Sequence, residues 1–404
     1  MKHCSFIFLI CFTATNITWS QAIDSTTITL KNGISKPSIL STHPFGIFIT
    51  RLQSNFKKTA SQKTGLSFSI ESGNVWSAPV TGYIPNDNDI RDQVSHIEWH
   101  KREFAFNINE IDAQRIDIAI DGILKGFRGQ LSIPINSKSD LNIGFRSYIL
   151  TKGKTPFTIL TGDQFIESFH DYIAGGEDPF ARRVFGFNKA KILYNDRNNN
   201  TLEIQNGDFL IGGLETSYYY YPNFLSNPNK NIYSNFGTHI GFNLSKYNSS
   251  IDIGFSGNVL KQYHLKDQKY FQIGVGIGLL KKNGIEFSSK NLVFGTNEFI
   301  GHIETAIEYN FISKRQTTHS FGIDFYLQTS YNKKSEFNYL IPVRNGVSEK
   351  TWANGLQHLY ENNNYWTFLY SFTKKVTTTF YVQQDLTLNN NPDIQTGMSI
   401  SFSL

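Results

Sequence analysis

The chain has 404 residues, a formal net charge of +5 and two cysteines. The charge is small and spread along the chain, which excludes an obvious nucleic-acid-binding surface. Aromatic residues make up 15% of the chain and hydrophobic residues 39%. This combination of many aromatics with low mean hydropathy is unusual for a soluble core and ordinary for a transmembrane β-barrel.

The first 22 residues predict a cleaved secretory signal peptide. A polar start at residues 2–3 precedes a mostly apolar core at residues 5–12, and residues 20–22 form a small-x-small cleavage site. The apolar core is too short to cross a bilayer, and no later stretch approaches the roughly 18 consecutive apolar residues of a spanning helix.

Both cysteines, Cys4 and Cys11, lie in this leader. The mature chain would therefore contain no disulfide and no thiolate metal site. We expect residues 23–62 to form an N-terminal segment in the periplasm or in a lumen, and residues 63–404 to form the main domain.

The first half of that domain contains several candidate strands. They lie at residues 65–76, 104–111, 115–124, 127–135 and 141–150. Residues 201–221 form either one long strand or two strands that turn at Asn206-Gly207, a strong turn dipeptide. The choice changes the count by one, so we predict roughly 12 to 16 strands.

The period changes from two to 3.6 within the long connection at residues 151–183. One helical stripe contains Phe165, Ile166, Phe169, Tyr172 and Ile173. Thr161 and Gln164 have the spacing of a capping box, and Gly175-Gly176 provides a stop. We expect a short amphipathic helix that folds over or into the lumen.

The polar residues of this connection are of the types that active sites use: Glu167, His170, Asp171, Arg182 and Arg183. Glu167 and His170 have a spacing found in metal sites of helical bundles, but the repeated copy that such a site needs is missing. Ser168, His170 and Asp171 lie too close together on one turn to align as nucleophile, base and orienting group. We therefore favour a helix that plugs or braces the barrel over a metal or catalytic site.

From about residue 235 onward, apolar and polar residues alternate with the period of a strand. The stretch FQIGVGIGLL is an example. The units match the roughly 9–11 tilted residues that cross a bilayer. The polar face carries many glycines and a set of acids that we expect to line the lumen and to favour cations: Asp252, Glu286, Glu304, Glu308, Asp324 and Asp385.

The connections predict the asymmetry of a membrane barrel. We expect Lys281-Lys282, Lys314-Arg315 and Lys374-Lys375 in short turns at one end, and residues 151–183 and 332–363 in long loops at the other. Lysine pairs are also common in turns of any kind, so the pairs alone do not decide the point.

The last residues, PDIQTGMSISFSL, form a strand with Ile394, Met398, Ile400, Phe402 and Leu404 on one face. This segment resembles the terminal strand signal of bacterial outer-membrane proteins, which implies recognition of Ile394 to Leu404 by the barrel assembly machinery. We predict an all-β, antiparallel transmembrane barrel in the outer membrane of a Gram-negative bacterium. A secreted or periplasmic β-protein is the alternative.

The helical stretch DQFIESFHDYIAGG, followed by ARR and preceded by RIDIAIDGILKGFRGQLSIPI, resembles a family of uncharacterised bacterial outer-membrane proteins, domain-of-unknown-function family three-one-eight-seven. The resemblance is best over residues 45–220. Residues 177–180 depart from the glycine–arginine continuation of that family. The resemblance implies the fold and the compartment but no reaction.

These observations predict a channel or transporter whose loop helix constricts the lumen, with no cofactor. An outer-membrane lipid-processing hydrolase that uses His170 or His302 as its base is one alternative. A closed structural or adhesive barrel that acts through residues 332–363 is another.

Overall fold

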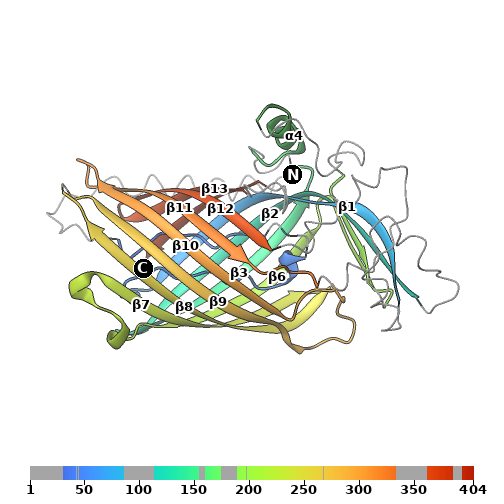
Figure 1. Ribbon diagram of the computed structural model, residues 1–404, viewed down its shortest axis with the longest axis horizontal. Helices are drawn as coiled ribbons and strands as arrows, with labels where there is room; N and C mark the ends of the chain where they lie inside the picture. Colours follow the sequence, from blue (N-terminus) through green and yellow to red (C-terminus); the bar gives the residue numbers. More distant parts are fainter. Residues whose placement is uncertain are drawn as a thin grey trace. The chain divides into compact units, whose positions relative to one another are not determined.

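The computed structural model describes residues 31–85, 113–153, 160–173, 189–333, 362–384 and 394–404, apart from residues 42, 44, 197 and 267. Its fourteen strands form one antiparallel sheet, and twelve of them close into a barrel because β1 pairs with both β14 and β2 (Figure 1). The barrel strands are β1 (Gly65–Pro85), β2 (Ala113–Asn136), β3 (Ser139–Thr151), β6 (Phe209–Tyr220), β7 (Ile232–Ser245), β8 (Asn248–His264), β9 (Tyr270–Glu286), β10 (Phe299–Ile312), β11 (Thr318–Gln328), β12 (Asn363–Thr373), β13 (Val376–Gln384) and β14 (Gln395–Ser403).

The predicted fold class is therefore confirmed, with the strand number at the low end of the predicted range. The candidate strands at 115–124 and 127–135 are one continuous strand, β2. The chain does not turn at Gly126, where a Cβ atom would lie 2.5 Å from the Glu71 side chain inside the barrel. The candidate strand at 104–111 lies outside the described residues.

The remaining elements lie in the connections. They are β4 (Lys191–Asn195) and β5 (Thr201–Gln205), which form a hairpin on β2, the helix α4 (Asp163–Tyr172), and the 3-10 turns η1 (Gly46–Phe48), η3 (Asn223–Leu225) and η4 (Pro228–Lys230). The chain turns at Asn206-Gly207, where Gly207 has a φ of 93°. Within the described part of the chain, no helix is long and apolar enough to cross a membrane.

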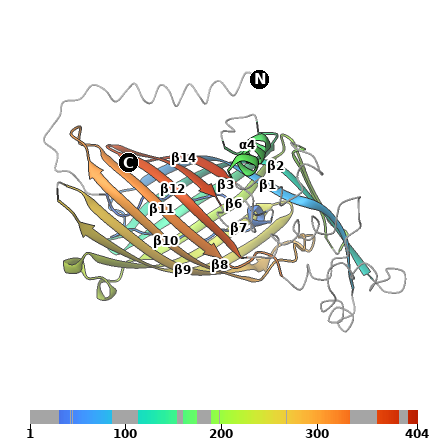
Figure 2. The same ribbon diagram turned by 45° about the horizontal axis from the view of Figure 1, so that its top comes forward.

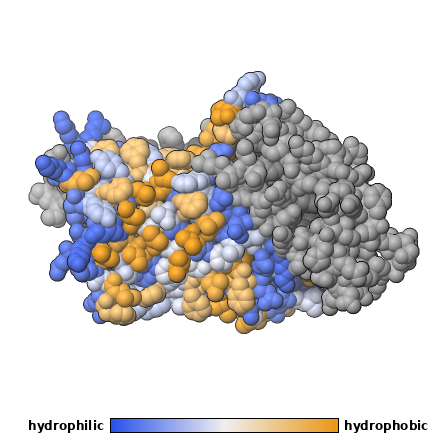
Figure 3. Space-filling model, viewed as in Figure 1, coloured by the Kyte–Doolittle hydropathy of each residue, from blue (hydrophilic) through white to orange (hydrophobic). Residues whose placement is uncertain are grey.

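The two faces of the barrel differ in polarity as the alternation predicts. Outward-pointing side chains form an apolar belt that includes Phe68, Phe145, Phe236, Ile240, Phe255, Val275, Ile277, Ile303, Ile307, Phe321, Ile323, Phe368, Phe380 and Ile400. Figure 3 shows part of this belt on the visible face. Their neighbours in sequence point inward and are mostly polar, which is the arrangement of a barrel in lipid.

The two ends of the barrel also differ. Gly65 of β1 pairs with Ser403 of β14 at what we call the turn end. Lys314-Arg315 and Lys374-Lys375 lie in short turns there, whereas the connections after β3 and β11 are long and lie at the opposite, loop end. The prediction for Lys281-Lys282 was wrong, because both residues lie within β9 toward the loop end. By the usual barrel asymmetry, we expect the turn end to face the periplasm.

Candidate functional site: a plugged lumen

Residues 32–62 fill the interior of the barrel, and we call them the plug. A barrel of eight strands is just filled by its own side chains, and one of sixteen leaves an aqueous channel. A ring of twelve therefore leaves space that the plug occupies. The plug has an outgoing leg (residues 32–41), a tip that contains η1 (residues 45–48) and a return leg (residues 49–60), and the blue turn η1 is visible inside the barrel in Figure 2.

The plug runs from the turn end to the loop end and back. Its legs meet near the turn end, where the Ile34 amide donates to the Phe56 carbonyl at 3.0 Å. The Ser61 amide donates to Asp140, at the start of β3, at 2.9 Å. At the loop end, Phe48 contacts Tyr247 and Phe294, with ring centroids 6.0 and 5.0 Å apart.

Carboxylates of the wall accept hydrogen bonds from the backbone of the plug. Glu71 accepts from the Leu40 amide at 3.0 Å, Asp252 from Thr50 at 3.0 Å, and Glu304 from Ser54 at 2.7 Å. Hydrogen bonds to an ionised acceptor are the stronger kind. The acids therefore fix the plug at several heights in the lumen.

Inward-facing glycines make room for the return leg. A Cβ atom on Gly241 would lie 1.8 Å from the Thr50 side chain, and one on Gly276 would lie 2.0 Å from that of Ser54. Gly254 and Gly274 take the same position opposite Leu52 and Phe56, at 2.8 and 2.5 Å. These glycines of β7, β8 and β9 form a groove for alternate side chains of the leg.

The charges of plug and wall are complementary. The plug contains Lys36, Arg51, Lys57 and Lys58 and no Asp or Glu. Lys36 forms ion pairs with Glu304 and with Asp324, the latter at 3.1 Å, and Lys57 lies 3.7 Å from Asp140.

Arg51 projects from the plug in the opposite direction to its neighbours Thr50 and Leu52. Its guanidinium carbon lies 4.3 Å from the ring centroid of Tyr326 and 5.1 Å from that of Tyr365, and Nη1 donates to the Leu40 carbonyl at 2.9 Å. A guanidinium between two aromatic rings is held by cation–π attraction and stacking.

Two wall arginines also contact the plug. Arg128 bonds Glu71 and donates to the Ser38 hydroxyl, both at 2.8 Å. Arg146 donates to the Ile49 carbonyl at 3.1 Å and lies 3.1 Å from Glu215. Both guanidinium groups have a carboxylate of the wall as partner, so neither is an unneutralised cation.

An apolar cluster closes the lumen at the loop end. The tip residues Phe45, Ile47 and Phe48 pack with Tyr194, Leu202 and Ile204 of the β4–β5 hairpin and with Leu292 and Phe294. The hairpin is fastened to the Leu292–Phe294 segment by Asp196, which accepts from the Val293 amide at 3.0 Å. The mouth is therefore sealed by packing, and the legs below it are held by polar contacts and by smaller apolar clusters that include Ile39, Leu52 and Phe56.

The structure places most of the predicted lumen acids on the inner face. Asp252, Glu304, Glu308 and Asp324 are buried there. Glu286 lies at the loop end of β9 and is exposed, accepting from Asn283 at 3.0 Å. Asp385 lies outside the described residues.

The expectation that the loop helix constricts the lumen was wrong. The turn before α4 contacts the outer face of β1: Thr161 Oγ1 lies 2.9 Å from Ser72 Oγ, and Asp163 accepts from Asn74 at 2.9 Å. Ser72 and Asn74 continue the outward row of Phe68. Figures 1 and 2 show α4 outside the barrel, beside β1 and β2.

The burial pattern of α4 explains this position. Asp163, Ile166 and Glu167 are buried, whereas Tyr172 and Ile173 of the predicted apolar stripe are 86% and 72% exposed. The N-cap residue is Gly162, without a side-chain cap, so the predicted capping box does not form. Of the other predicted residues, Asp171 is exposed, His170 lies in α4, and Arg182 and Arg183 lie outside the described residues.

Because α4 lies outside the barrel, deleting residues 163–173 is expected to leave the ion conductance of the protein unchanged. Planar-bilayer recordings of the deletion variant beside the full chain would measure this. A several-fold rise in conductance in the variant would contradict the placement of α4.

His302 is the second histidine considered as a base. It is buried on the inner face, 3.4 Å from Ser54 Oγ, and stacks on Tyr326 at 5.2 Å. This position faces the plug and not the lipid, which contradicts its use as the base of a lipid-processing enzyme. Among the described residues, no group of three His, Cys, Asp or Glu side chains could hold a metal ion.

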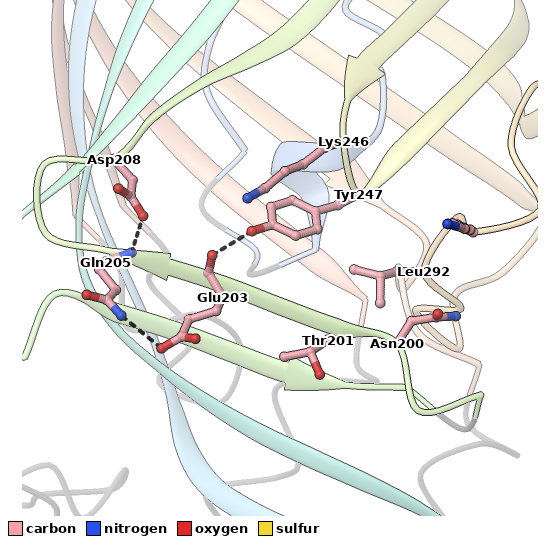
Figure 4. Close-up of a pocket in the computed structure, with 9 residues that line it drawn as sticks. Asn200, Thr201, Glu203, Gln205, Asp208, Lys246, Tyr247 and Leu292 are labelled. Atoms are coloured by element: carbon pink, nitrogen blue, oxygen red, sulfur yellow. Dashed lines mark hydrogen bonds between the residues drawn. The ribbon is translucent and has the colours of Figure 1, made fainter.

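A polar groove of about 590 Å³ lies at the loop end (Figure 4). Its lining includes Glu203 and Gln205 of β5 and the turn residues Lys246 and Tyr247. The Tyr247 hydroxyl donates to the Glu203 carbonyl at 2.5 Å, and Gln205 donates to the Glu203 side chain at 2.9 Å. The neighbouring Tyr247 raises the pKa of Lys246. These groups largely bond one another, which favours a structural role in joining β5 to the turn after β7.

The closed ring, apolar outside and polar inside define an outer-membrane β-barrel protein. No protein-family model and no curated protein matches the chain. Solved structures similar to it include an outer-membrane channel from Pseudomonas putida F1, with 9% identity, a TM-score of 0.38, and 87% of this chain and 100% of that chain covered.

A second similar structure is the NanC porin, with 7% identity and a TM-score of 0.34; the match covers 83% of this chain and 100% of that chain. A third is the transport unit of the autotransporter AIDA-I from Escherichia coli, with 11% identity and a TM-score of 0.36; the match covers 85% of this chain and 91% of that chain. These likenesses concern the barrel fold, which is that of outer-membrane proteins of Gram-negative bacteria. Membership of the family suggested by the helical motif stays a prediction.

Proposed function

We propose that this protein is an outer-membrane transport barrel gated by its own N-terminal plug. The observation that carries the proposal is the cationic, acid-free plug held in a lumen where five wall carboxylates contact it: Glu71, Asp140, Asp252, Glu304 and Asp324. When the plug withdraws, the same carboxylates face water, so the emptied lumen remains a stable polar surface.

The polar contacts between the legs and the wall favour a movable plug over a fixed core. A buried polar contact that breaks in an aqueous lumen is replaced by hydrogen bonds to water, so its net cost is small. Along the return leg, the contacts of Thr50 and Ser54 with the wall are of this kind. The tip and leg residues such as Leu52 and Phe56 must also leave their apolar clusters, and this step would set the barrier to opening.

The open lumen is expected to prefer cations. Asp140, Asp252, Glu304 and Asp324 lose their plug partners on opening, whereas Arg128 and Arg146 retain Glu71 and Glu215 as partners. A pore lined by excess carboxylate attracts cations and repels anions.

The test compares the full mature chain with a variant lacking residues 32–60, both refolded and inserted into planar bilayers. The expected result is a nearly closed full chain and a conducting variant whose reversal potential in a salt gradient indicates cation preference. A variant that is folded, as judged by heat-modifiable migration on a gel, yet does not conduct would refute the proposal. Anion preference would refute the assigned selectivity.

A closed structural barrel is the second candidate, and the apolar seal at the loop end favours it. Phe45 and Phe48 are almost fully buried there, as in a permanent core. A barrel that stays closed after the seal is weakened would support this candidate.

The compartment and the assembly route belong to the same proposal. We infer that a cleaved leader exports the chain and that the barrel assembly machinery recognises the last strand, Ile394 to Leu404. Met398, Ile400 and Phe402 pair with outward-facing residues of β1 as such a strand requires. Ile394, however, precedes β14 and is buried, so it does not share their lipid-facing side.

A further inference from the structure

The lumen wall contains a site that the plug itself occupies with cations. We name it the cation box and define it as Glu304 of β10, Asp324 and Tyr326 of β11, and Tyr365 of β12. These residues lie close together because β10 pairs with β11 and β11 with β12, with Glu304 opposite Tyr326 and Tyr326 opposite Tyr365.

One half of the box holds a primary ammonium group. The Lys36 ammonium forms ion pairs with both Glu304 and Asp324, and all three side chains are almost fully buried. Within the described part of the chain, Asp324 Oδ1 has no hydrogen-bond partner although it is buried. The carboxylates therefore retain acceptor capacity that Lys36 does not use.

The other half holds a planar guanidinium. The rings of Tyr326 and Tyr365 flank Arg51 at 4.3 and 5.1 Å. The Tyr326 hydroxyl donates to Gln328 Oε1 of the same strand at 2.9 Å, and its other acceptor is the Leu52 carbonyl of the plug. The Gln328 contact remains when the plug withdraws and still orients the ring, which lowers the entropic cost of binding a ligand.

We propose that Lys36 and Arg51 stand in for a transported solute, and that the open barrel binds solutes carrying a guanidinium or a primary ammonium group in the cation box. This inference rests on the proposed gating, since the box becomes vacant only when the plug withdraws. An aromatic pair beside two carboxylates selects such groups over inorganic cations, because stacking adds to the charge attraction.

The first test uses the full chain and does not require conduction. Arg51→Ala vacates the guanidinium half, so the variant is expected to unfold at a lower temperature. About 10 mM methylguanidinium should then raise its midpoint by a few degrees, because a ligand that binds the folded state stabilises it. The same concentration of urea, a neutral isostere, should not.

Two controls and one alternative variant accompany this test. Methylguanidinium should not stabilise the unsubstituted chain, nor Arg51→Ala combined with Tyr326→Leu and Tyr365→Leu. Should Arg51→Ala fail to fold, Lys36→Ala with methylammonium repeats the experiment in the other half of the box. The absence of stabilisation in the folded variant would overturn the inference.

The second test separates this inference from the gating proposal. In the barrel lacking residues 32–60, L-arginine is expected to interrupt the potassium current, and neutral L-citrulline to leave it unchanged. A current insensitive to arginine would overturn the inference alone. A folded barrel with no current would overturn the gating proposal, while the rescue experiment in the full chain would still decide the cation box.

Discussion

Alanine at both Gly274 and Gly276 is expected to displace the return leg of the plug and to raise the conductance of the full chain many-fold. The added Cβ atoms would lie 2.5 Å from the Phe56 ring and 2.0 Å from Ser54 Oγ. Contacts this short cannot persist, so either the wall or the plug must move. The wall is fixed by its ladder to β8 and β10, and the plug is held mainly by side-chain contacts, so the plug moves.

The matched control is alanine at Gly257 and Gly301. In these positions the nearest atoms to the added Cβ would lie at 3.6 and 3.8 Å, which is ordinary van der Waals contact. The control should fold and conduct like the unsubstituted chain. If the Gly274 and Gly276 variant folds and its conductance equals that of the control, the glycine groove does not hold the plug in place.

Replacing Phe45 and Phe48 by alanine is expected to break the seal at the loop end. Both rings are buried in the apolar cluster and contact the Phe294 ring, with centroid distances of 5.1 and 5.0 Å. A buried Phe→Ala change costs about 3–5 kcal/mol, so the double variant should lose most of the stability that retains the tip. Hydrogen exchange of the plug amides should become faster by orders of magnitude, and openings should become frequent in bilayer recordings.

Phe68→Ala provides the comparison, since Phe68 points outward and is 54% exposed. It removes the same side chain without touching the plug, so exchange at the plug amides should not change. A barrel that stays closed in the Phe45 and Phe48 variant, with faster exchange at the tip, would favour the closed structural barrel over the gate.

The barrel itself was predictable because its side chains alternate between the lipid and the lumen along every strand. Lipid outside and polar groups inside impose an alternation that residues such as Phe255, Asp252 and Ile277 carry locally, without reference to distant parts of the chain. Most of the later strands followed for the same reason, although β9 continues through Lys281-Lys282, which were expected in a turn. β2 was split in two because a glycine in a strand and a glycine in a turn look alike in sequence.

The plug was the principal feature that sequence reasoning missed. It was placed in the periplasm or a lumen, without a role, because residues 32–62 have neither the strand nor the helix period. Two signals were present: the segment has bases and no acids, and glycines recur on the polar face of β9. Both acquire meaning only when Ser54 and Phe56 are seen opposite Gly276 and Gly274.

The helix α4, in contrast to the plug, was recognised in the sequence but placed wrongly. Its existence was predicted correctly from its period, and its position was not. An apolar stripe normally marks the buried side of a helix, but α4 buries Asp163 and Glu167 and exposes Tyr172. Periodicity reports that one face is apolar and cannot report which environment that face meets.

The sequence by itself determined the class of fold, the polarity of both barrel faces and the acidic character of the inner wall, because each depends on residues close together in the chain. Only the tertiary structure decided what fills the lumen and which cations face which acids. Those contacts join residues far apart in sequence, as Thr50 and Asp252 or Ser54 and Glu304 show. No local pattern encodes such a pairing, because it arises only when the ring closes around the plug.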